Sequence, residues 1–133
     1  MNDDPANWPT DMNNNVRDYL AMKGPPNIPG NSFPRNGKGL CFSKFHCKRK
    51  LLNGESVERP WIIYSKSADR IYCFYCKLFI KNASMALSTS GFNDWSNVHT
   101  RLCEHEKSKN HMEATCSYWE LHQRLFNGQT IDK

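Results

Sequence analysis

The sequence predicts a small α+β zinc-binding domain in which a β-hairpin packs on two helices, preceded by a flexible N-terminal arm. Three observations carry this prediction. Two short runs are rich in β-branched and aromatic residues, two later segments have helical apolar spacing, and a cysteine pair and a histidine pair can join them through one metal. The 133 residues leave room for one domain and tails. Hydrophobic residues make up only 38%, so we expect a small core that needs further stabilisation, for example by a structural metal.

The N-terminal part is rich in residues that disfavour regular structure. Residues 1–36 hold six of the seven prolines and many asparagines, with little apolar periodicity. This composition buries too little apolar surface to order itself, so we expect a flexible leader. Within it, residues 16–22 favour one or two helical turns that end at Gly24.

Residues 37–58 are predicted to form a basic amphipathic connecting segment. Phe42, Phe45 and Leu52 recur at helical spacing, and the Asn-Gly pair at 53–54 offers a helix stop. We therefore expect a short basic helix here.

The predicted hairpin occupies residues 61–74. Residues 61–64 and 70–74 have strand-forming composition and are separated by a polar turn. Cys73 would leave the second strand, and Cys76 would complete a metal knuckle. We expect residues 77–80 to continue as strand or turn.

Two helices are predicted after the hairpin. Four residues share one helix face: Trp95, Val98, Leu102 and His105. Six helical residues rotate by about 600°, so His111 cannot lie on that face of an unbroken helix. We expect the chain to turn and Ser108 to cap a second helix that stops at residues 127–128. The domain would then span residues 59–128 and leave 129–133 as a tail. Three tryptophans are expected in its core: Trp61, Trp95 and Trp119.

The cysteine and histidine pairs have the composition of a structural zinc site. Cys73-x2-Cys76 precedes His105-x5-His111 by 28 intervening residues. Two thiolates and two imidazoles suit one tetrahedral Zn²⁺, although the ordinary finger has a gap of only ~12–15 residues. We predict one structural zinc bound by these four side chains.

Other uses of the cysteines are less favoured. Six cysteines could form three disulfides, but no secretory signal is recognisable, so we expect reduced thiols. A redox Cys-x2-Cys pair would need to lie at the N-terminus of a helix that follows a strand. Residues 77–80 are expected to be strand or turn, so that position is not expected here. His99 and Cys103 form a competing pair on another face, and Cys103 is the expected substitute if His105 fails. Otherwise the four remaining cysteines are expected to be structural or free: Cys41, Cys47, Cys103 and Cys116.

Enzymatic activity has little support in the sequence. No Ser-His-Asp order, glycine-rich phosphate loop or spaced carboxylate pair stands out. Four protein ligands would also leave the zinc without an open position for water. We therefore expect no catalysis. No apolar run approaches the ~20 residues of a membrane helix, so no membrane association is expected.

Positive charge is concentrated around the cysteine pair. The net charge is +5, but residues 35–81 carry eleven basic and three acidic side chains, a net of +8. A confined positive field favours phosphate contacts, so DNA is the expected partner. Eight cations are the candidate DNA contacts: Lys48, Arg49, Lys50, Arg59, Lys66, Arg70, Lys77 and Lys81. The alternative is a zinc-stabilised module that docks a partner protein through its C-terminal helix without touching DNA.

Four motifs resemble the TTF-type zinc finger: Trp61-Ile-Ile-Tyr-Ser, Arg70-Ile-Tyr-Cys-Phe-Tyr-Cys-Lys-Leu-Phe, Gly91-Phe-Asn-Asp-Trp and His105-Glu-Lys-Ser-Lys-Asn-His. That finger occurs in the N-terminal part of hAT-type transposases and their descendants, including proteins of the MYM-type zinc-finger group. The leader motif Asp4-Pro-Ala-Asn-Trp-Pro is also similar. The resemblance implies a nuclear DNA-binding finger with the four Cys and His residues at the metal positions. Long relatives add an RNase H-like catalytic domain to which nothing here corresponds, so transposase activity is not expected.

Overall fold

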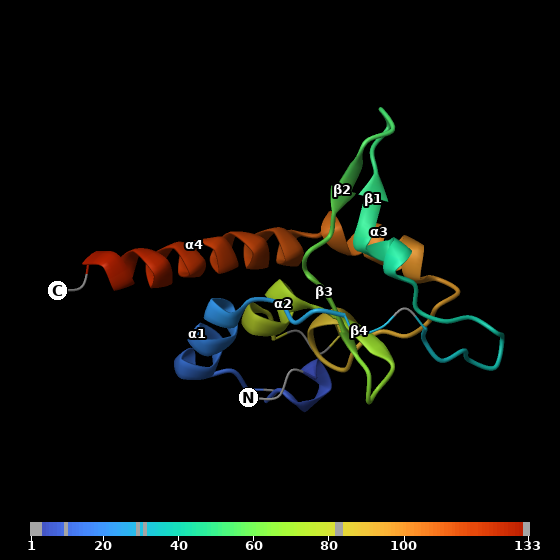
Figure 1. Ribbon diagram of the computed structural model, residues 1–133, viewed down its shortest axis with the longest axis horizontal. Coiled ribbons are helices and arrows are strands. Elements are labelled where there is room, and N and C mark those ends of the chain that lie inside the picture. Colours follow the sequence, from blue (N-terminus) through green and yellow to red (C-terminus); the bar gives the residue numbers. More distant parts are fainter. Residues whose placement is uncertain (1–3, 10, 29, 31, 82–83, 132–133) are drawn as a thin grey trace.

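The computed structural model describes residues 4–9, 11–28, 30, 32–81 and 84–131 (Figure 1). Its elements, in chain order, are η1 (Pro5–Asn7), α1 (Asn14–Lys23), η2 (Lys44–Cys47), β1 (Lys48–Lys50), β2 (Ser56–Glu58), β3 (Ile62–Ser65), β4 (Arg70–Cys73), α2 (Phe74–Phe79), η3 (Ala86–Ser88), α3 (Val98–Glu106) and α4 (Lys109–Ile131). Two antiparallel hairpins and the helices form a small α+β structure, which confirms the predicted fold class.

The β3–β4 hairpin lies at the centre of the core. Its register pairs Ile62 with Cys73 and Ser65 with Arg70, as the strand composition predicts. Phe92 extends the sheet by one bridge, because its backbone exchanges two hydrogen bonds of 2.9 Å with Ile71. The preceding Gly91 has φ 90°, and a Cβ there would lie 2.7 Å from the Tyr72 ring. Only glycine therefore fits at residue 91 without a shift of its neighbours.

Helix α2 follows β4 without a loop, so the prediction of strand or turn at residues 77–80 was wrong for most of this segment. Cys73 is the extended N-cap residue, and the Ile80 amide closes the last turn by donating to the Cys76 carbonyl at 2.8 Å. The helix buries Phe74 and Leu78 and packs against α4. Burial against α4 outweighs the strand propensity of this apolar run.

The predicted break between the last two helices is present. The Ser108 hydroxyl accepts a 3.1 Å hydrogen bond from the His111 amide and thereby caps α4. Helix α4 then continues to Ile131, past the stop expected at residues 127–128. A glycine inside a helix costs only about 1 kcal/mol, so an Asn-Gly pair does not by itself end one.

The leader does not behave as the flexible arm that its composition predicts. Helix α1 is capped by the Asn13 side chain, ends at Gly24 and packs against α4 (Figure 1). Leu20 and Ala21 are buried in it, and Trp8 ahead of it packs edge-on against a core phenylalanine. The few apolar residues of the leader bury apolar surface of α2 and α4. The average composition of the 36 residues does not reveal these contacts.

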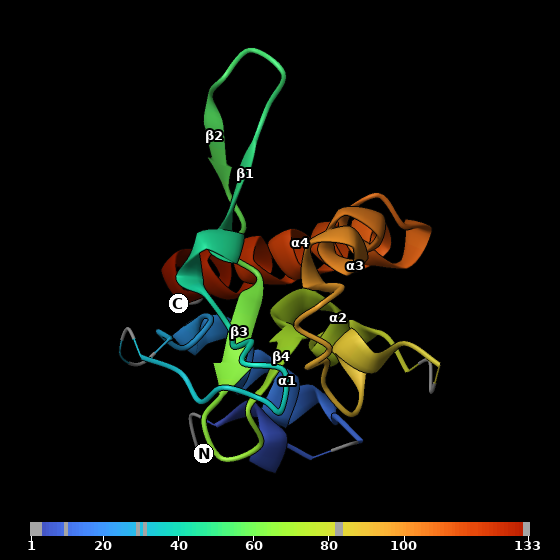
Figure 2. The ribbon, with the colours of Figure 1, turned by 90° about the vertical axis from the view of Figure 1, so that its right-hand side faces the viewer.

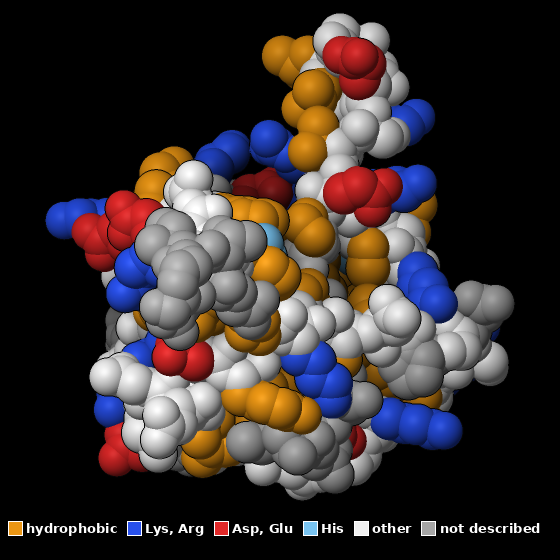
Figure 3. Space-filling model, turned by 60° about the vertical axis from the view of Figure 1, so that its left-hand side comes forward, with side chains coloured by type: hydrophobic (Ala, Val, Ile, Leu, Met, Phe, Trp, Pro, Cys, Tyr) orange, Lys and Arg blue, Asp and Glu red, His pale blue; other side chains and the backbone are white. Residues whose placement is uncertain are grey.

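Residues 48–58 form a hairpin, preceded by the single turn of η2, and not the expected basic helix. Strand β1 pairs with β2, and this two-stranded ribbon projects from the body of the molecule (Figure 2). Phe42 is buried, whereas Phe45 and Leu52 are 77% and 110% exposed, so the helical apolar spacing has no packing counterpart. The Asn-Gly pair at 53–54 lies in the ribbon's turn, a use that this dipeptide also favours. Figure 3 shows blue lysine and arginine side chains around the base of the ribbon.

Packing of α1 generates a prediction about the leader. Leu20→Ala should lower the free energy of unfolding by about 2–5 kcal/mol, because it leaves a cavity beneath α4. Urea unfolding followed by tryptophan fluorescence measures this. The neighbouring Tyr19→Ala, which truncates a 45% exposed side chain, is the matched control and should change stability by less than about 1 kcal/mol. Equal stability of both variants and the parent would mean that the leader is not packed.

Candidate metal centre

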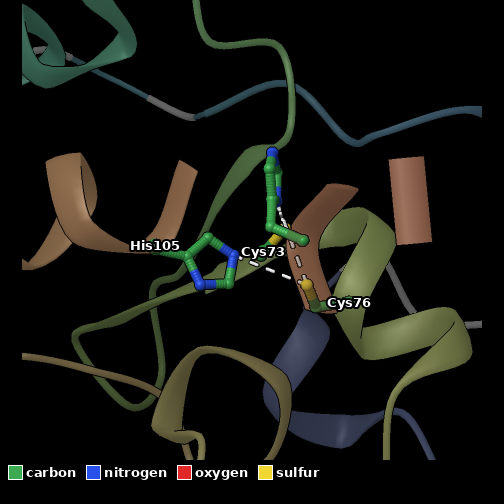
Figure 4. Close-up of side chains that lie close together, drawn as sticks. Cys73, Cys76 and His105 are labelled. Atoms are coloured by element: carbon green, nitrogen blue, oxygen red, sulfur yellow. Dashed lines mark hydrogen bonds between the residues drawn. The ribbon is translucent and has the colours of Figure 1, made fainter. Parts of the chain in front are cut away.

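Four elements bring the two cysteines and two histidines together. Cys73 ends β4, Cys76 lies in α2, His105 is near the end of α3, and His111 is in the first turn of α4. All four side chains are buried, and one ligand atom from each lies within 4.8 Å of all the others. His105 points at Cys76 in Figure 4, where Nε2 and Sγ are 3.5 Å apart.

The distances within this cluster fit a tetrahedral zinc ion. His111 Nδ1 lies 3.4 Å from Cys73 Sγ and 3.9 Å from Cys76 Sγ. With Zn–S near 2.3 Å and Zn–N near 2.0–2.1 Å, tetrahedral angles put sulfur and nitrogen ligands ~3.5 Å apart. The four side chains therefore lie close enough to share one zinc ion, and they would fill its coordination sphere as a structural site does.

The electrostatics of the two thiols also call for a cation. A hydrogen bond with Cys73, together with those to the two imidazoles, lowers the pKa of the Cys76 thiol. Burial raises the pKa of the Cys73 thiol well above its ordinary value, and the neighbouring Cys76 adds to this. The protein groups alone thus favour one thiolate. A second negative charge in this buried place needs a positive ion beside it.

Aromatic rings and one hydroxyl hold the imidazoles in place. The Trp61 ring centroid lies 4.6 Å from that of His111 and 5.3 Å from that of His105. Ser108 donates a 2.8 Å hydrogen bond to the His105 carbonyl while it caps α4. Trp61 was expected only as core. Trp61 is the first residue of the predicted hairpin and so pairs with the end of the strand that carries Cys73, which was the signal for this further role.

The competing donors lie outside the cluster. Cys103 Sγ is 3.8 Å from His99 Nε2 on the other face of α3, and the exposed His99 is not among the four grouped side chains. The described part of the chain contains no other group of three or more such donors close enough to share one ion.

Cys73 follows a strand and directly precedes helix α2, which is the position that the redox alternative requires. The sequence-based objection to it was therefore wrong. All six cysteines are free thiols in the structure, as expected for a reduced chain. Two imidazoles within 3.9 Å of the sulfurs complete a donor set that a metal uses and a dithiol couple does not need.

Arg59 has a structural position that the charge analysis missed. It is only 3% exposed, and its guanidinium donates to both Glu106 oxygens at 2.9 and 3.0 Å. A further bond to the His46 carbonyl fixes the chain before β1. Arg59 therefore ties the base of the ribbon to α3 and is not available to phosphate, so its selection as a DNA contact was wrong.

The other candidate cations are dispersed. Three of them lie together on β1: Lys48, Arg49 and Lys50. The Lys48 ammonium is 3.5 Å from a carboxylate oxygen of Glu58, and the Arg49 guanidinium is 3.7 Å from one of Glu106. Lys66 is exposed in the β3–β4 turn, at the end of the molecule away from the ribbon (Figure 2). Among the described residues, Lys50 and Lys66 have no ion-pair partner.

The three cations near the knuckle are engaged by the protein. Arg70 donates to the Ser90 carbonyl at 3.3 Å. The Lys77 ammonium lies 4.5 Å from the Tyr72 ring centroid, and burial lowers the pKa of Lys77. Lys81 pairs with Asp11. The eight candidates therefore do not form one continuous surface, and only the β1 group is clustered. Within the described ranges, no helix combines the length and apolar character of a membrane span.

Comparison with known proteins identifies relatives of the whole chain. It is 35% identical to zinc finger MYM-type protein 5 of Mus musculus over 124 residues, which are 93% of this chain and 20% of that protein. The Homo sapiens protein is 35% identical over 129 residues, which are 97% of this chain and 19% of that one. No family model matches the chain, and no solved structure matches it. The chain is thus homologous to zinc finger MYM-type protein 5 and spans about a fifth of its length.

The buried cluster generates a prediction about stability. Cys76→Ser should unfold the region from Trp61 to His111, because structural zinc contributes about 10–16 kcal/mol to the folding of zinc-finger peptides. Circular dichroism and zinc content by mass spectrometry measure the effect, and a strong chelator should reproduce it in the parent protein. Cys116→Ser, at an exposed position of α4, is the matched control. A parent that keeps its full stability in chelator would contradict the prediction.

A second prediction separates the two sets of possible ligands. His105→Ala should abolish tight zinc binding, whereas His99→Ala and Cys103→Ser should leave it within about 3-fold, because neither group belongs to the cluster. Competition with a chromophoric chelator gives the affinities. Loss of tight binding in Cys103→Ser, with binding kept in His105→Ala, would place the fourth ligand at Cys103.

Proposed function

We propose that this chain is a nuclear, structural zinc finger of the MYM-type group that binds DNA through the β1–β2 ribbon. The observation that carries the proposal is the ribbon itself: two antiparallel strands that project from the body and carry three consecutive cations, Lys48, Arg49 and Lys50. The major groove of B-DNA is wide enough to admit a two-stranded ribbon. Lysine and arginine on such an element would contact phosphates and supply affinity with little choice of sequence.

In this proposal the zinc is structural and Cys73, Cys76, His105 and His111 hold it. When bound, the metal would neutralise the thiolates and fix α3 against the central hairpin. The ribbon depends on that arrangement, since Arg59 links its base to Glu106, the residue after His105. We further propose that the finger is of the TTF type and descends from the N-terminal part of a hAT-like transposase. The motif resemblance supports this origin.

A second function has an observation in its favour. Three large apolar side chains of α4 are exposed at seven-residue spacing: Met112 at 55%, Trp119 at 50% and Phe126 at 42%. Such a stripe suits the docking of a partner protein. The exposure of Trp119 corrects the expectation that it lies in the core. Its neighbour Tyr118 is buried, and Leu125 is half-buried.

The ribbon generates a prediction about salt dependence. Replacing Lys48, Arg49 and Lys50 together by Gln should weaken binding to duplexes of every sequence alike. The log–log slope of affinity against salt should flatten by up to about 2.7, because each lost phosphate contact removes ~0.9. Fluorescence anisotropy with two unrelated duplexes, across a salt series, measures both quantities.

The matched control removes three cations from the helical side of the molecule: Lys23, Lys109 and Arg124. If this variant flattens the slope as much as the ribbon variant, general charge and not the ribbon determines binding. A zinc-loaded protein without measurable affinity at low salt would favour protein docking through α4.

A further inference from the structure

A hollow of about 470 Å³ lies between the base of the ribbon and α3. Five of its lining side chains are cationic and one, Glu106, is acidic; the cations are Lys48, Arg49, Lys50, Arg59 and Lys107. Since Glu106 is already paired with Arg59, the remaining charge of this hollow is positive. Its surface suits an anion.

A second hollow, of about 380 Å³, also has Phe45 in its lining. Arg35 and Lys44 contribute to its lining, and none of the described residues around it is acidic. Phe45 lines both hollows and is 77% exposed. An exposed phenylalanine is therefore shared by two hollows that have cationic linings.

We infer that Phe45 and its two flanking hollows bind a single-stranded segment of nucleic acid. Proteins that hold unpaired strands combine a positive groove, which follows the phosphates, with aromatic side chains that stack on bases. The phosphates on either side of one nucleotide would lie in the two hollows, and its base would lie on the Phe45 ring.

This site distinguishes paired from unpaired strands. In a duplex the faces of the bases are stacked on one another, so an aromatic ring has no free face to cover. Arg49 and Lys50 serve the ribbon as well, so the inference rests on the proposed binding of nucleic acid. Phe45 belongs to the single-strand site alone, which makes it the residue to test.

The experiment measures binding of the zinc-loaded chain to oligo(dT) of about 12 nucleotides and to a duplex, by fluorescence anisotropy. Phe45→Ala should weaken oligo(dT) binding about 10-fold and leave duplex binding unchanged, whereas Phe45→Trp should retain or tighten it. Met112→Ala, which truncates another exposed side chain, is the control. Oligo(dA) that carries 2-aminopurine should lose fluorescence on binding to the parent and not to Phe45→Ala. Oligo(U) in place of oligo(dT) tells whether RNA or DNA is preferred.

Unchanged oligo(dT) affinity in Phe45→Ala would overturn the inference, and so would an equal loss for oligo(dT) and duplex. In either case, salt-dependent duplex binding that needs Lys48, Arg49 and Lys50 would leave the proposed function in place. Absence of binding to any of these probes by the parent protein would overturn both.

Discussion

Four donors that meet in one buried place connect elements that the sequence keeps far apart. Cys73 and Cys76 belong to the strand-to-helix junction, and His105 and His111 belong to the helix-to-helix junction. Each pair sits where the chain changes direction, so the cluster fixes two corners of the fold relative to each other. Burial of two thiolates at this point is favourable only if their charges are compensated. A zinc ion shared with the two imidazoles would supply that compensation.

Hydrogen bonds and aromatic packing connect the cluster to the neighbouring segments. Ser108 holds both histidine-bearing segments, and Arg59 extends the arrangement to the ribbon through Glu106. A buried ion pair of this kind adds little net stability against an apolar substitute, but loss of one partner leaves an uncompensated charge. Arg59 and Glu106 therefore determine the position of the ribbon relative to α3 and add little to the free energy of folding.

Sequence reasoning identified the elements whose signals are local. The strands around residues 62–73, the break before Ser108 and the four grouped donors follow from composition, spacing and helix geometry. The packed leader was missed because its order depends on contacts with α4, about 97 residues away in the case of Tyr118 and Ala21. The ribbon was missed for a different reason. Apolar residues at helical spacing predict a helix only if that face is buried, and Phe45 and Leu52 are not buried. The Asn-Gly turn was available as a hairpin signal. The burial of Arg59 has no sequence signal, since a cation beside a basic strand looks the same whether or not a carboxylate covers it.

The position of Glu106 has a thermodynamic consequence. This carboxylate follows His105 in the chain, lies 3.7 Å from Arg49 and lines the hollow beneath the ribbon. An ion in the cluster would hold α3 through His105, and an occupant of the hollow would lie against the same helix. By linkage, whatever factor the metal adds to the affinity of the hollow for its occupant, the occupant adds to the affinity of the cluster for the metal. The affinities of the two sites would then be coupled through the last turn of α3.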